Sequence, residues 1–129
     1  MELVPYDASA VARLLERAGR ADGHAPLSGH KLEVIGADRS RTGTWADASV
    51  ICAVGVAAFH EASAHWAVEV AVAPERRSSQ VEKEAILAAA GLVPDSAAHT
   101  IWAFRPAQLK AAGLIGYREI RAVLRMAGP

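Results

Sequence analysis

Cysteine, aromatic side chains and net charge are all scarce in this chain. It has one cysteine, Cys52, only 5% aromatic residues, and 14 basic against 14 acidic residues. A lone cysteine excludes an internal disulfide framework, and its place in an apolar run indicates a buried structural thiol rather than a nucleophile. A net charge of zero gives no electrostatic footprint for nucleic acid or for an anionic membrane surface.

Long apolar runs are also missing. The longest candidate is interrupted by His60, Glu61 and Glu69, so we expect no membrane-spanning segment. The first seven residues, MELVPYD, are acidic and lack the basic and apolar regions of a secretory signal. We therefore expect a cytoplasmic protein.

The composition that is present is typical of a soluble globular domain. Hydrophobic residues make up 52% of the chain and charged residues 22%. At 129 residues the chain is long enough for one core, and we expect a single domain over residues 1–129.

The first half of the chain predicts two helices and a connector. Apolar residues at helical spacing predict a helix that Asp7 or Ser9 begins and Gly19 ends. Residues 28–35 predict a shorter helix, and the polar residues 38–47 predict an exposed connector.

The rest of the chain alternates strands and helices. Valine-rich residues 49–59 and 66–72 predict an antiparallel pair, and further strands are predicted at 100–104 and 117–126. Helices are expected at 81–90 and from Pro106 onward. The packing stripe of the first of these two helices is predicted to be Val81, Ala85, Ala88, Ala89 and Leu92. The fold class is therefore α/β (α+β), with a mixed, mostly antiparallel central sheet flanked by helices.

Residues 69–91 are the most informative stretch. They indicate a buried strand, a stop at Pro74, a short basic loop and a helix. That order points free backbone N–H groups at the space beyond the strand end, which suits a phosphate.

Three segments resemble one family. Residues 21–28 (ADGHAPLS) are similar to an ADGxAPLS segment, and residues 69–77 (EVAVAPERR) to a strand and loop motif, ELVVHPxxRRRGIG. IWAF at 101–104 with GYREIRAVLRM at 116–126 is similar to WAH…GFxxxRELLQM. Together they resemble the GCN5-related N-acetyltransferase (GNAT) superfamily, and most closely the amino-terminal half of mycothiol synthase.

This resemblance implies a single GNAT-like domain that binds acetyl-CoA and acetylates a small amine. The backbone of Val70, Ala71 and Val72 would pair with the pantetheine arm as an added strand does. The residues implied at the pyrophosphate are Arg77, Ser78, Ser79, Gln80, Val81, Glu82 and Lys83.

The chain departs from the family pattern in this loop. Gln80 and Glu82 stand where the family has glycine, and Glu82 would repel a diphosphate unless Lys83 or Arg77 neutralises it. The tyrosine that often serves as the acid in the family corresponds to Ala112.

Glu69 is the candidate catalytic residue, since the resemblance implies a carboxylate base at this strand position. The alternative is a strand carboxylate that is solvated or paired with arginine. No metal site is expected, because His60, Glu61 and His65 fall on a hairpin turn and do not have His-Glu-x-x-His spacing.

Two functions stay open from the sequence. The first is an acetyl-CoA-dependent N-acyltransferase with a degenerate pyrophosphate loop, acting on a small amine. The second is a catalytically inactive GNAT-like binding or regulatory module that acts through a homodimer or a GNAT-domain partner, because the amino-terminal half that it resembles normally packs on a second unit.

Overall fold

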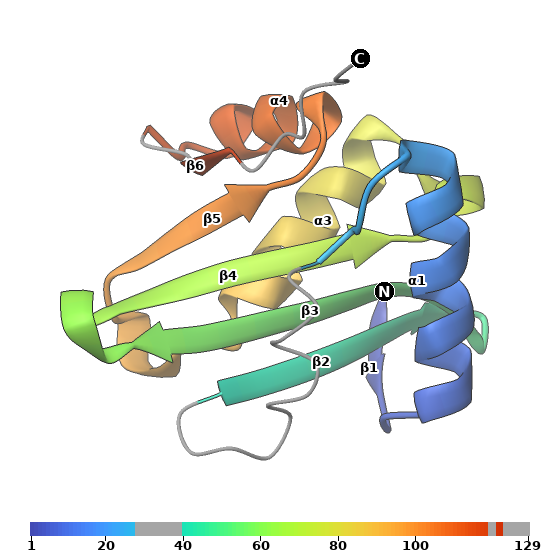
Figure 1. Cartoon of the computed structure of the whole chain (residues 1–129), viewed down its shortest axis with the longest axis horizontal. Helices are drawn as coiled ribbons and strands as arrows, with labels where there is room; N and C mark the ends of the chain where they lie inside the picture. The colour runs from blue at the N-terminus through green and yellow to red at the C-terminus, as the bar shows by residue number, and fades with distance from the viewer. Residues whose placement is uncertain (28–39, 119–120, 123–129) are drawn as a thin grey trace.

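In the part of the chain that the structure describes, a six-stranded sheet in the order β1-β2-β3-β4-β5-β6 forms the centre of the molecule. We describe a computed structural model over residues 1–27, 40–118 and 121–122. Neighbouring strands from β1 to β4 are antiparallel, whereas β4–β5 and β5–β6 are parallel. The α/β (α+β) class with a mixed, mostly antiparallel sheet flanked by helices is confirmed (Figure 1).

The elements follow one another in a simple order along the chain. The strands are β1 (Glu2–Val4), β2 (Ser40–Asp47), β3 (Val50–His60), β4 (His65–Val72), β5 (His99–Ala103) and β6 (Arg121–Ala122). The helices are α1 (Ala8–Asp22), α3 (Ser79–Ala90) and α4 (Pro106–Leu114), with short 3-10 turns at Glu61–Ser63, Pro74–Arg76 and Pro94–Ser96.

Helices α1 and α3 cover opposite faces of the sheet (Figure 1). Val11 and Leu14 of α1 pack with Val54 and Val56 of β3, which lie on one face. Residues of α3 pack on the other face against alternate residues of β4. The contacting side chains on that face include Ala85, Ile86, Ala89, Val68, Val70 and Val72.

Most predicted elements are present, with shifted ends. The antiparallel pair is confirmed as β3 and β4, and Asp7 caps α1 by accepting a hydrogen bond from Ala10 N–H. Helix α1 runs past Gly19 and ends at Gly23, whose left-handed φ of 74° suits glycine. The helix predicted at 28–35 lies outside the described residues, as does most of the strand predicted at 117–126.

The connector predicted at 38–47 is wrong, because residues 40–47 form strand β2. Its residues are polar, but Thr44 and Trp45 are buried and the strand pairs on both sides with β1 and β3. The Trp45 ring lies over Gly43 and Gly55, which face each other across the strand pair. Both glycines therefore make room for the indole.

We expect Gly55→Ala to lower the free energy of unfolding by about 1–3 kcal/mol, since overpacking a core costs that much. A Cβ added at Gly55 would lie 2.8 Å from the Trp45 ring and 3.1 Å from Ala89. The control is Gly113→Ala in α4, where the added Cβ meets nothing within 4 Å. Urea unfolding compares the two variants, and equal stability would contradict the packing account.

Candidate functional site

Strands β4 and β5 pair for only part of their length. Backbone pairing joins Trp66–Val68 to His99–Ile101, and the two strands then diverge (Figure 1). The gap that opens lies beside residues 69–72 of β4, which include residues 70–72, where the resemblance implies the arm of a cofactor. Helix α4 follows β5 directly and stands at the open end of this gap.

Among the described residues, the side chains of Gln108 and Arg77 form hydrogen bonds to β4 in the gap. The buried Gln108 of α4 donates from Nε2 to the Val70 carbonyl at 2.7 Å, and its Oε1 accepts from Phe104 N–H at 2.7 Å. Arg77 Nε donates to the Val72 carbonyl at 3.2 Å. Gln108 therefore joins β4 to the end of β5 in place of a backbone ladder.

The start of α3 is earlier than the sequence predicts. Ser78 caps the helix, and its Oγ accepts from Val81 N–H at 3.1 Å. Gln80 to Lys83 therefore belong to the first turns of a helix and not to an extended loop. The uncapped N–H groups of Ser79 and Gln80 remain as donors at the helix start.

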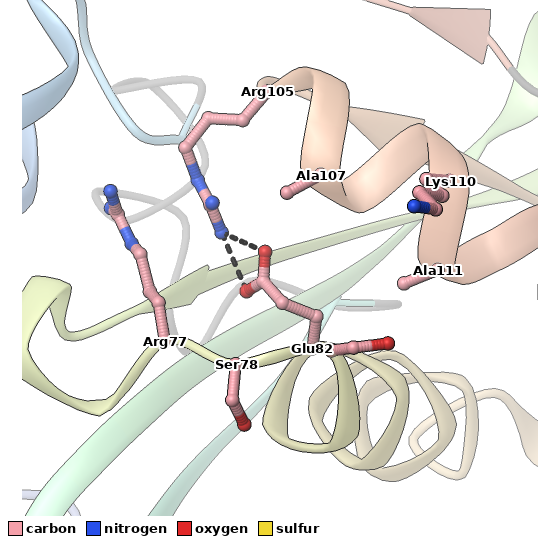
Figure 2. A pocket seen from close by; sticks show the side chains of 8 residues that line it. Arg77, Ser78, Glu82, Arg105, Ala107, Lys110 and Ala111 are labelled. Carbon is pink, nitrogen blue, oxygen red and sulfur yellow. Dashed lines mark hydrogen bonds and ion pairs between the residues drawn. The ribbon is translucent and has the colours of Figure 1, made fainter.

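A cavity of about 320 Å³ lies between the start of α3 and helix α4 (Figure 2). Its lining residues are Arg77, Ser78, Ser79, Glu82, Arg105, Ala107, Lys110 and Ala111. Four of the residues predicted for pyrophosphate are among them, whereas Gln80, Val81 and Lys83 are not. Gln80 instead donates along the helix to Glu84, so its side chain does not obstruct the cavity.

Glu82 is neutralised by a residue that the sequence analysis did not single out. Its carboxylate is 3% exposed and accepts two hydrogen bonds from Arg105 Nη2, at 2.6 and 2.5 Å (Figure 2). The expected neutralising partners, Lys83 and Arg77, do not make this contact in the structure. A buried carboxylate in such a charge-assisted pair repels an incoming anion far less than a lone one does.

A second carboxylate continues this network. Asp22, the last residue of α1, accepts from both terminal nitrogens of Arg77, at 2.6 and 3.0 Å, and lies 3.9 Å from Arg105 Nε. The four charges alternate in sign and join α1, α3 and α4 at one corner. The two guanidinium groups balance Asp22 and Glu82, so the exposed Lys110 adds a positive charge to the cavity.

Glu69 lies on the other face of β4, away from α3. Its register partner is Val56, which packs against α1, and its neighbours on the same face are Ala67 and Ala71. The side chain is fully buried. Small side chains therefore lie on both sides of the candidate base along β4.

The other positions considered for a proton donor or a nucleophile are buried or bonded to neighbouring residues of the fold. Ala112, the position where the resemblance implies an acid, is buried in the core, and its methyl side chain has no proton to donate. His99 Nε2 lies 2.8 Å from the Tyr117 hydroxyl, and burial raises the pKa of Tyr117. Burial also raises the pKa of the Cys52 thiol, which donates to the Trp45 carbonyl.

Two kinds of feature are missing from the described residues. They contain no group of three or more His, Cys, Asp or Glu side chains arranged to hold a metal ion. Within the same residues, no helix has the length and apolar character needed to cross a membrane.

No protein-family model matches the chain, and no curated protein matches it in sequence. Among solved structures, it is similar to a mutant of TTHA1254 from Thermus thermophilus. The two share 17% identity with a TM-score of 0.56, and the match covers 100% of this chain and 99% of the other. At this identity the similarity concerns the fold alone, and it extends over the whole length of both chains.

Proposed function

We propose that this chain binds an acyl-CoA and transfers its acyl group to a small amine, as a GNAT-like N-acyltransferase. The observation that carries the proposal is the cavity at the start of α3, beside the open end of the gap between β4 and β5. A diphosphate placed there would meet the N–H group of Ser79 and the ammonium of Lys110.

In this proposal, the cofactor, Glu69 and water have separate roles in the reaction. The cofactor would supply the acyl thioester, whose C–S bond breaks as the amine nitrogen bonds to the carbonyl carbon. Glu69 would accept the proton that the amine loses. Because Ala112 has no proton to give, water would protonate the departing thiolate.

Thermal unfolding with acetyl-CoA tests the proposal. A ligand at one hundred times its dissociation constant stabilises a fold by about 2.7 kcal/mol, which at this size corresponds to a shift of several degrees. Lys110→Ala should reduce the shift because it removes the exposed cation of the cavity. Lys83→Ala, a lysine of α3 that does not line the cavity, is the matched control.

The absence of any shift at millimolar acetyl-CoA would contradict the proposal. A shift that Lys83→Ala and Lys110→Ala reduce equally would place the ligand elsewhere.

Two observations favour a second function. Gln108 occupies the Val70 carbonyl, and Ala112 replaces the acid, so the scaffold has features of an inactive module. Such a module would act through a homodimer or a separate GNAT-domain partner. Acetyl-CoA binding without turnover of any small amine would support this second function.

A further inference from the structure

Gln108 places a carboxamide where an extended ligand would pair with β4. It is 2% exposed, and both ends of its amide are bonded to main-chain groups, one on each side of the gap. A peptide-like amide carries the same donor and acceptor, so the side chain reproduces the pairing that an added strand would make.

We propose that Gln108 is an internal competitor for this gap, and that it determines affinity for ligands with an amide-bearing arm. This inference rests on the proposed function, because the arm considered is that of an acyl-CoA. For its arm to bind in the gap, the ligand must displace the Gln108 amide from the carbonyl of Val70 and from Phe104 N–H.

The geometry separates the arm from the phosphates. Gln108 is not among the residues that line the cavity at the start of α3, although it belongs to the same helix as Lys110 and Ala111. The side chain therefore competes with the arm while the phosphate end of a ligand binds independently of it.

Two variants remove the competition in different ways. Gln108→Ala removes both hydrogen bonds and empties the gap, and Gln108→Met removes the bonds but keeps most of the volume. A buried hydrogen bond contributes a modest net free energy, so losing the competitor should tighten binding of acetyl-CoA roughly tenfold in Gln108→Ala. The gain should be smaller in Gln108→Met, which also keeps the fold testable if the alanine variant is unstable.

Three probes distinguish this role from a purely structural one. Isothermal titration would compare acetyl-CoA, pantetheine, which is the arm without nucleotide, and adenosine 3′,5′-bisphosphate, which is the nucleotide end without arm. Binding of acetyl-CoA and pantetheine should tighten in the variants, while binding of the bisphosphate should not change. Glu16→Gln, at an exposed position of α1 that pairs with Arg20, should leave all three affinities as they are.

The outcomes separate this inference from the proposed function. If the unmodified protein and both Gln108 variants bind acetyl-CoA with equal affinity, the competitor role is wrong while acyl-CoA binding stands. An equal change for the bisphosphate and for pantetheine would also overturn it, because the effect would then be a general distortion. If none of the proteins binds acetyl-CoA, the proposed function fails and this inference fails with it.

Discussion

Replacing Arg105 with methionine should lower the free energy of unfolding by about 3–5 kcal/mol, because it leaves the buried carboxylate of Glu82 without its cation. For a domain of this size, that loss corresponds to a decrease of about 10–20 °C in the melting temperature. Urea unfolding followed by circular dichroism measures the change directly.

Two further variants show whether burial causes this effect. Arg17→Met breaks the ion pair between Arg17 and Glu75, whose two side chains are 46% and 50% exposed, respectively. This change should lower the free energy of unfolding by at most about 1 kcal/mol. The double variant Arg105→Met with Glu82→Met should recover much of the lost stability, since apolar groups can replace a buried pair. If Arg105→Met were no more harmful than Arg17→Met, the buried pair would not stabilise the corner.

The second large effect concerns catalysis. If the chain is an N-acyltransferase, Glu69→Gln should lower turnover by about 10²–10⁴-fold, the usual contribution of a general base. Glutamine keeps the size of the side chain in its buried position between Ala67 and Ala71. Acetyl-CoA affinity should stay unchanged, because Glu69 lies on the α1 face and the cavity lies beside α3.

The matched control for Glu69 is Glu75→Gln, which removes an exposed carboxylate that follows the same strand. It should leave turnover as it is. Equal turnover of Glu69→Gln and the unmodified protein would exclude Glu69 as the base. The proton acceptor would then have to be water or another group.

The sequence predicts the central strands and the helix after β4. In these elements the valine-rich and helical patterns match the residues that are buried on the two faces of the sheet. It fails at β2, whose polar residues are typical of a connector. Tertiary packing decides that strand, since Gly43 and Gly55 admit the Trp45 ring between sheet and helix. Local propensity contains no signal for a contact between two strands.

The Glu82–Arg105 ion pair is a part of the candidate site that the sequence pattern did not predict. The stripe predicted for α3 includes Val81 and Ala88, which are half-buried, whereas the buried residues are Glu82, Ala85, Ile86 and Ala89. Glu82 thus lies three and four residues before buried apolar ones, and a carboxylate in such a stripe indicates a buried cation nearby. That signal could have been found, but the partner, 23 residues away, could not have been named.

Gln108 gave no sequence signal for its contact with β4. As the third residue of a helix it is typical of a capping position, where a glutamine side chain reaches back toward the preceding backbone. Only the divergence of β4 and β5 brings it to the Val70 carbonyl. The site therefore depends on sheet geometry that local sequence does not encode.

The central proposal is that the diphosphate of an acyl-CoA binds between the start of α3 and helix α4. The most direct test is a titration of ¹⁵N-labelled protein with acetyl-CoA, followed through backbone amide shifts. We predict the largest changes at Ser78, Ser79 and Gln80, with smaller ones around Lys110. Saturating changes confined to other parts of the chain, or no changes at millimolar ligand, would contradict the claim.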